Sequence, residues 1–376
     1  MHMPENAGDL RMKPPKPPAP PRPPASQAEK APPAPAGAAL TPEWLRWVTE
    51  QLLRGCTPDS VLATMTAAGL DAQASAELIE QVPGNAVFVA AEGRAQQLRK
   101  LESTLANLQL LWEIDPMYGI VDKRVSVSED EFIERYVRGC RPLVLTGHTR
   151  DWPAMRRWSP DYLKERFGHL DVEVQAERQA NPRYEEDKAL HRRSVRLGDF
   201  VDQVLAGGDT NDYYLTANNE ALRRPDFAPL LDDIGSLPPC CVRAELAERS
   251  SFWFGPGGTV TPLHHDTLML FHTQVVGRKR WRLISPLQGQ RLYNTNGVFS
   301  PIDLDAIDLR QFPLFEGVRV LEVVVWPGET IFLPLGWWHQ VRALDISLSF
   351  SYSNLALPMA NQFIYFDPVP RAVPDV

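Results

Sequence analysis

Two histidines and one carboxylate in this sequence have the types and spacing of a metal site. His264 and Asp266 lie two residues apart in the segment TVTPLHHDTLMLFH, and His339 ends the later segment WPGETIFLPLGWWH. Residues i and i+2 of a β-strand lie on the same face, so His264 and Asp266 can reach one point inside a barrel. Two histidines and one carboxylate form the facial triad of non-haem Fe(II) oxygenases, which leaves open positions for a co-substrate and O₂.

The spacing of these three residues leaves other interpretations open. His265 lies beside His264 but on the opposite face of an expected strand, so we assign it to packing or to a supporting role. A lone His-x-Asp pair is also compatible with an ordinary hydrogen bond in a protein core. A zinc hydrolase is conceivable from such ligands, but it would leave the lysine described next without an anionic partner.

Lys279, in the segment GRKRW, is the second chemical signal. Strand alternation places Lys279 on one face and both Arg278 and Arg280 on the other. A lysine directed into a barrel needs an anion, because an unpaired buried charge is costly. A dicarboxylate co-substrate would supply that anion, and the hydroxyl groups of Thr261 and Tyr214 could complete its binding site.

The elements that must position these residues are short strands. From about residue 125 onwards the sequence has a mixed pattern, with strand-like segments separated by glycine and proline turns. Several short strands of this kind predict a mainly β fold, an antiparallel barrel or jelly roll. The clearest predicted strands cover residues 251–254, 268–276, 279–284, 318–325, 330–333 and 346–352. Upstream, residues 141–146 and 171–175 also predict strands, and residues 159–167 predict a helix.

The first 112 residues have a different character. Residues 1–40 are rich in proline and poor in large apolar residues, so we expect a disordered tether, and we favour a spacer over a ligand for a proline-binding domain. Residues 41–83 predict a small bundle of three helices, because Thr41 and Thr57 are each an N-cap followed by proline. Leucines at three- and four-residue spacing predict one linking helix over 84–112. Residues 113–376 remain for the catalytic domain.

Composition excludes several classes of partner. The net charge of −8 argues against nucleic acid, which requires a basic surface. No apolar run is long enough to cross a membrane, and the N-terminus has no apolar core of a signal peptide. The four cysteines have no metal-type spacing. We therefore expect a cytoplasmic protein with no membrane partner.

In combination, the motifs resemble the JmjC/cupin-like Fe(II)- and 2-oxoglutarate-dependent oxygenases. The resemblance depends on TPLHHD at 261–266, GRKR at 277–280, and the PGE, LP and WWH elements within 327–339. It covers about residues 112–357 and is closest to the branch of protein asparaginyl and arginyl hydroxylases. It implies a double-stranded β-helix, the jelly roll of cupins, with flanking helices.

The resemblance implies roles for individual residues. The iron ligands match His264, Asp266 and His339, and residues that bind 2-oxoglutarate match Lys279, Thr261 and Tyr214. Leu270 stands where the family has an asparagine, and a second family asparagine falls near Ser351. His272, two residues after Leu270 on the same strand face, is a candidate for the missing polar contact. Trp337 and Trp338 are expected either to wall the pocket or to belong to the core.

The implied reaction is hydroxylation of a C–H bond with O₂, coupled to conversion of 2-oxoglutarate to succinate and CO₂. We favour a protein or peptide substrate, because the N-terminal helices and tether could engage a macromolecule. A small-metabolite hydroxylase and a catalytically silent binding module are the alternatives. A lysine demethylase is less well supported, since the chain is acidic and has no histone-reading module. A homodimer stays open.

Overall fold

The computed structural model describes residues 32, 40–115, 117–217, 219–294 and 297–357. Almost all of the predicted proline-rich tether lies outside these residues. The chain divides into two compact units, residues 1–101 and 102–376, and the division falls within helix α4 (Ala86–Glu113). The finer division at residues 40, 83 and 112 stays a prediction. No helix among the described residues is long and apolar enough to cross a membrane.

The first unit contains the three helices that the sequence predicts. They are α1 (Pro42–Leu53), α2 (Pro58–Ala67) and α3 (Ala72–Gln81), followed by one 3₁₀ turn, η1 (Val82–Gly84). The side chains of Thr41 and Thr57 accept hydrogen bonds from the backbone of the first turns, as N-caps do. The apolar faces of the helices meet in a core that includes Trp44, Trp47, Val48, Met65 and Ile79.

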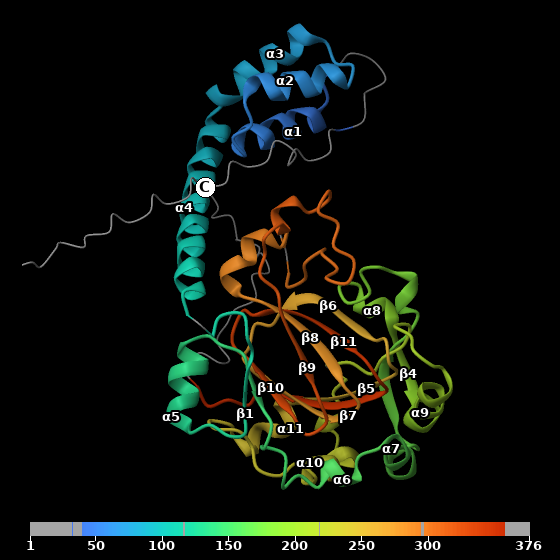
Figure 1. Ribbon diagram of the computed structural model, residues 1–376. Coiled ribbons are helices and arrows are strands. Elements are labelled where there is room, and N and C mark those ends of the chain that lie inside the picture. The colour runs from blue at the N-terminus through green and yellow to red at the C-terminus, as the bar shows by residue number, and fades with distance from the viewer. Residues whose placement is uncertain (1–31, 33–39, 116, 218, 295–296, 358–376) are drawn as a thin grey trace, which may run out of the picture. The chain divides into compact units, whose positions relative to one another are not determined.

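The second unit is built on two mainly antiparallel sheets (Figure 1). The six-stranded sheet has the order β1 (Asp122–Arg124), β2 (Leu143–Leu145), β10 (Thr330–Leu333), β7 (Leu270–Val276), β12 (Ser347–Tyr352) and β5 (Ser250–Gly255). The four-stranded sheet has the order β6 (Val260–His265), β11 (Trp338–Ala343), β8 (Lys279–Ile284) and β9 (Leu321–Val325). Apolar residues of both sheets share one core cluster, so the sheets pack face to face. The prediction of a mainly β jelly roll is confirmed.

Helices flank the six-stranded sheet. Bulky residues of these helices and of β5, β7, β10 and β12 form the largest core cluster. The helices in this cluster are α6 (Ala154–Arg157), α7 (Pro160–Phe167), α9 (Leu197–Ala206), α10 (Ala228–Asp232) and α11 (Leu246–Arg249). Two further short helices of the second unit, α5 (Glu129–Glu131) and α8 (Lys188–His191), contribute no residue to it. A π-helical segment, η2 (Phe132–Arg138), continues α5. The 3₁₀ turns are η3 (Arg178–Ala180), η4 (Ala221–Arg223), η5 (Pro225–Phe227), η6 (Arg243–Glu245), η7 (Pro286–Arg291) and η8 (Pro313–Phe315).

The observed strands differ from the predicted ones mainly at their starts. The strand expected at 268–276 begins at Leu270, and the one expected at 318–325 begins at Leu321. The strand predicted at 171–175 is present as β3 (Asp171–Gln175), but it pairs with β4 (Arg192–Arg196) in a separate two-stranded sheet. The predicted helix at 159–167 is α7, with Ser159 as its N-cap.

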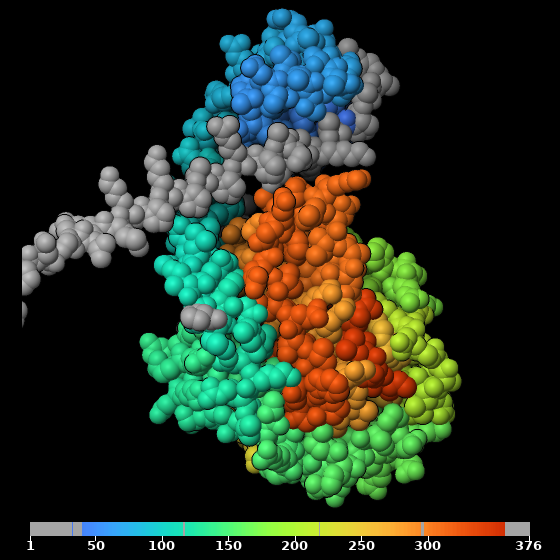
Figure 2. All heavy atoms as spheres, in the orientation of Figure 1, coloured from blue at the N-terminus to red at the C-terminus, as the bar shows by residue number. Residues whose placement is uncertain are grey.

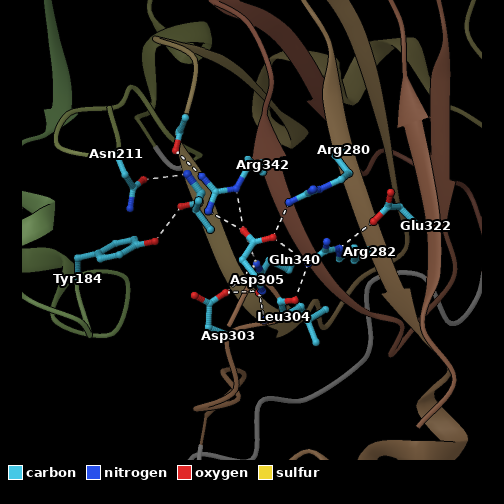
Figure 3. Close-up of polar contacts among 12 residues, drawn as sticks. Tyr184, Asn211, Arg280, Arg282, Asp303, Leu304, Asp305, Glu322, Gln340 and Arg342 are labelled. Atoms are coloured by element: carbon cyan, nitrogen blue, oxygen red, sulfur yellow. Dashed lines mark hydrogen bonds and ion pairs between the residues drawn. The ribbon is translucent and has the colours of Figure 1, made fainter. Parts of the chain in front are cut away.

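A long segment connects β8 to β9, and its described residues, 285–294 and 297–320, lie at the surface of the second unit, in orange in Figure 2. The Asp305 carboxylate of this segment forms ion pairs with three arginines of β8 and β11, namely Arg280, Arg282 and Arg342 (Figure 3). The amide of Gln340 adds three contacts. Its Oε1 accepts from the Leu304 backbone N–H at 2.9 Å, and its Nε2 donates to Asp303 at 3.0 Å and to Asp305 at 3.3 Å. These bonds attach the connecting segment to the outer face of the four-stranded sheet.

Candidate metal and co-substrate site

A cavity of about 500 Å³ lies between the two sheets. Alternate residues of five strands reach it, as the pleat of a β-strand requires. They include His339 and Val341 from β11, Lys279 and Trp281 from β8, Leu270 and His272 from β7, Ser251 and Trp253 from β5, and Ser351 from β12. All eight side chains predicted for the site line this one cavity.

His264, Asp266 and His339 converge at one place in the cavity. One potential ligand atom of each lies within 4.8 Å of the others. Nε2 of His264 lies 3.9 Å from Oδ1 of Asp266, and Nε2 of His339 lies 3.6 Å from Oδ2 of the same carboxylate. Antiparallel pairing of β6 with β11 sets His264 directly opposite His339. Strand pairing therefore brings together ligands that are far apart in the sequence.

Both histidines are held by backbone carbonyls. Nδ1 of His264 lies 2.8 Å from the carbonyl oxygen of Pro262, and Nδ1 of His339 lies 3.0 Å from that of Trp337. A carbonyl can only accept, so each Nδ1 carries the hydrogen and each Nε2 keeps its lone pair. A histidine that ligates a metal is usually oriented by such a bond to its other nitrogen. The two rings are thus prepared to bind a cation through Nε2.

The electrostatics of the three groups favour a bound cation. Burial and the neighbouring His264 hold the pKa of His339 well below its usual range, so its imidazole is neutral. Burial also raises the pKa of the Asp266 carboxyl, because desolvation penalises the charged form. A divalent metal would favour the ionised carboxylate and would use both imidazole lone pairs. Two imidazoles and one carboxylate are a donor set that fits Fe(II).

Thr261 reaches the cavity because β6 carries a β-bulge. Thr261 and His264 are three residues apart, so strict alternation would place them on opposite faces. The pairing register shifts, however: His339 lies opposite His264, and Val341 lies opposite Thr261. Three steps along β6 therefore match two steps along β11, and the extra residue returns Thr261 to the side of the histidines.

Lys279 occupies the inner part of the cavity and is only 2% exposed. Its ammonium group donates to the Tyr214 hydroxyl at 2.9 Å and to Ser349 Oγ at 2.8 Å. No carboxylate pairs with it among the residues that the structure describes. Burial lowers the pKa of Lys279 to about 7. A buried cation with two hydroxyl partners and no counter-ion is suited to binding an anionic ligand.

The residues around Lys279 are also polar. Ser351 Oγ accepts the indole N–H of Trp253 at 2.7 Å, and the Trp253 ring lies 5.5 Å from the Lys279 ammonium. His272 is 4% exposed, and burial next to Lys279 and His339 keeps its pKa well below the usual range. The hydroxyl of Ser349 was missed by the sequence analysis, although alternation from Ser351 along one strand could have found it.

The tryptophans of the cavity are not those that the sequence suggested. Trp337 and Trp338 are core residues outside the cavity lining. The Trp337 ring lies 5.6 Å from that of Trp112, and Trp338 packs against His265 at 4.7 Å. Trp253 and Trp281 line the cavity instead. His265 itself lies outside the cavity lining, as predicted from its place on the other face of the strand.

Comparison with known proteins places this architecture and site in a family. A family described as "Cupin-like domain" matches residues 128–357, more than half of the chain. The chain belongs to the cupin-like family. The predicted resemblance to JmjC/cupin-like oxygenases is thereby confirmed at the level of the family.

Curated relatives of this cupin-like protein carry JmjC or demethylase names. It is 31% identical over 232 residues to "Lysine-specific demethylase 8" of Xenopus tropicalis, covering 60% of this chain and 50% of that protein. It is 30% identical over 274 residues to "Lysine-specific demethylase JMJ30" of Arabidopsis thaliana, covering 68% and 60%. It is 29% identical over 252 residues to "JmjC domain-containing protein D" of Dictyostelium discoideum, covering 60% and 55%. The chain thus spans between half and three-fifths of the length of these relatives.

Proposed function

We propose that this cupin-like protein is an Fe(II)- and 2-oxoglutarate-dependent oxygenase that hydroxylates a C–H bond of a protein or peptide side chain. One observation carries the proposal: the His264, Asp266 and His339 triad and the unpaired Lys279 line the same cavity. A metal triad alone would also suit a hydrolase. A buried lysine without a counter-ion in the same cavity adds a demand for an anion, which a dicarboxylate co-substrate meets.

In this proposal His264, Asp266 and His339 hold Fe(II). Bound iron would supply activation of O₂ coupled to oxidative decarboxylation of 2-oxoglutarate. The chain's own contribution is geometric, because the carbonyls of Pro262 and Trp337 fix the two imidazoles with Nε2 free. The ligands therefore need little reorganisation when the metal binds.

Lys279 and Tyr214 bind the far carboxylate of 2-oxoglutarate in this proposal, with Thr261 beside them. The charge-assisted hydrogen bond from Lys279 would be strong, since the site is shielded from water. Ser351 and His272 complete the polar surroundings of the co-substrate. Leu270, Phe299 and Val341 give the cavity apolar walls that limit access of water to the reacting C–H bond.

Two observations support a macromolecular substrate. The relatives named lysine-specific demethylases are named for a protein side chain. The cavity lining also includes charged residues of both signs, namely Glu220, Arg223, Glu248 and Arg249, which are suited to polar groups of a peptide. Demethylation of a methyl-lysine begins with hydroxylation of an N-methyl C–H bond, so methyl-lysine, asparagine and arginine side chains all belong to the substrate class to be tested.

The test is an anaerobic titration with Fe(II), with and without 2-oxoglutarate, read by the weak visible charge-transfer band of the chelate. We expect the band in the wild type and its loss in both His339→Ala and Lys279→Ala. Iron affinity should fall in His339→Ala and persist in Lys279→Ala, because only the first residue is a ligand. Arg280→Ala, on the outer face of the same strand as Lys279, is the matched control and should retain the band. A wild type that binds iron without the band would contradict the proposal.

Turnover is then measured as succinate formed in the presence of peptide mixtures that present methyl-lysine, asparagine or arginine. Stimulation by one class above the uncoupled rate would identify the substrate class. Stimulation only by small metabolites would contradict the proposed protein substrate.

A further inference from the structure

Two residues that line the cavity each carry a buried ring nitrogen without a hydrogen-bond partner. These nitrogens are Nε1 of Trp281 and Nε2 of His272, on side chains from residues that are 3% and 4% exposed. An indole N–H can only donate, and a buried donor without an acceptor is destabilising. Such groups in a native structure need an explanation, and a bound ligand is one.

Trp281 and His272 lie between the anion-binding lysine and the metal ligands. The Trp281 ring stacks on the His339 ring, with centroids 5.6 Å apart and planes 23° apart. The His272 ring meets the edge of Trp281 at 5.0 Å and lies 5.9 Å from Trp253. Trp253 in turn lies 5.5 Å from the Lys279 ammonium. A row of rings therefore connects Lys279 to His339, along the span that a dicarboxylate bound to both ends would occupy.

The sequence at Leu270 adds an independent reason for a polar group here. Leu270 and His272 follow each other on the cavity face of β7, and the leucine offers no hydrogen bond. Trp281 occupies the corresponding cavity face of β8, two residues after Lys279. The ring nitrogens of His272 and Trp281 therefore offer the hydrogen bonds that a leucine at position 270 cannot make.

We propose that the Trp281 indole N–H donates a hydrogen bond to an oxygen of bound 2-oxoglutarate and that His272 Nε2 makes a second polar contact with the same ligand. Trp281 is also a positioning residue, because its ring holds the imidazole of His339. The inference rests on the proposed function and adds to it the groups that recognise the middle of the co-substrate.

Trp281→Phe tests the indole N–H, because phenylalanine keeps an aromatic ring against His339 and removes the donor together with one ring of the indole. We expect the Kd for 2-oxoglutarate, measured anaerobically with Fe(II) through the charge-transfer band, to rise about fivefold to tenfold, the effect of one lost hydrogen bond. The Kd for Fe(II) alone should stay within about twofold, since no ligand is lost. Trp281→Leu should weaken both, because it also removes the ring that packs on His339.

Trp326→Phe is the matched control, because Trp326 is 50% exposed and outside the cavity lining. It should leave both constants unchanged. A Trp281→Phe protein that binds 2-oxoglutarate with the wild-type Kd would overturn the inference. Absence of 2-oxoglutarate binding in the wild type would instead overturn the proposed function, so the two failures are distinguishable.

His272→Phe tests the second contact and should raise the Kd for 2-oxoglutarate about fivefold. Adding Leu270→Asn to this variant restores a polar side chain on the same strand face and should recover most of the affinity. Wild-type affinity in His272→Phe would overturn the role of His272. Far-UV circular dichroism and thermal unfolding confirm in each case that the variant is folded.

Discussion

The two faces of the four-stranded sheet differ in how their charged side chains are paired. On the outer face, Arg280, Arg282 and Arg342 surround the carboxylate of Asp305 (Figure 3). On the inner face, one residue from Arg280 along β8, Lys279 has two hydroxyl partners and no carboxylate among the described residues. Its side chain is also far more buried than those of the three arginines.

This difference distinguishes charges that stabilise the fold from a charge that serves a ligand. The outer arginines are paired and partly exposed, so their contribution to stability is modest and needs no ligand. Lys279 is desolvated with two hydroxyl partners but no counter-charge among the described residues, which disfavours the folded protein until an anion binds. The same strand therefore combines a structural face with a functional one.

Lys279→Met should give the largest change in co-substrate affinity. It should also raise stability, so it distinguishes a charge that binds a ligand from a charge that stabilises the fold. We expect the Kd for 2-oxoglutarate to rise about 100-fold, the effect of losing a charge-assisted hydrogen bond in a buried site. The unliganded protein should become more stable by about 1 kcal/mol or more, because an unpaired buried charge is replaced by an apolar group of similar size. Calorimetric titration and urea unfolding measure the two effects. A variant that is less stable and still binds would show that Lys279 is structural.

The lowered pKa of Lys279 should make a measurable contribution to the pH dependence of stability. Its pKa is lowered by burial from 10.5 to about 7, so between these values the unfolded chain binds more protons than the folded one. Stability of the unliganded wild type therefore rises with pH across this window. The stability advantage of Lys279→Met should be largest at pH 7 and below and should shrink towards pH 10. Urea unfolding of both proteins at several pH values measures it, and an advantage that grows with pH would contradict the assignment.

Asp305→Asn should have the smallest effect on co-substrate binding, and it should lower stability where Lys279→Met raises it. Removal of the carboxylate leaves three arginines close together, and we expect a loss of about 1–2 kcal/mol of unfolding free energy, limited by solvent screening. The Kd for 2-oxoglutarate should stay within about twofold, because the cluster is on the outer face. Glu186→Gln, at an exposed position, controls for the change of net charge. A large loss of co-substrate affinity in Asp305→Asn would show that the two faces are coupled.

The sequence was sufficient for the parts of the site that depend on strand alternation. Alternation correctly separates Lys279 from its flanking arginines, and it unites His264 with Asp266. It also excludes Trp338 from the cavity, since its neighbour His339 faces inward, and it includes Trp281 on the face of Lys279. The suggestion that Trp337 and Trp338 wall the pocket was wrong because it relied on proximity in sequence to His339.

Other features depend on tertiary structure that no local pattern reveals. Arg178 is fully buried behind Tyr214, where it pairs with Glu185 at 3.0 Å, yet it lies in a turn without periodicity. Residues 285–320 likewise have no strand or helix period, although Phe299 from this segment packs 5.5 Å from the His264 ring. Such contacts join residues that are far apart in the sequence and are determined by the tertiary fold, which local patterns in a single sequence do not contain.

The bulge in β6 makes the pairing register as important as residue type for this site. Thr261 and His264 share the cavity because the two residues between them lie opposite a single residue of β11. If each of these two residues paired with its own residue of β11, without the bulge, every side chain of the triad and the anion pocket would be unchanged, but Thr261 would turn to the far side of the sheet. The position of Thr261 therefore depends on the pairing register of β6 with β11, and a substitution that removes the bulge would misplace this hydroxyl without changing any residue of the cavity.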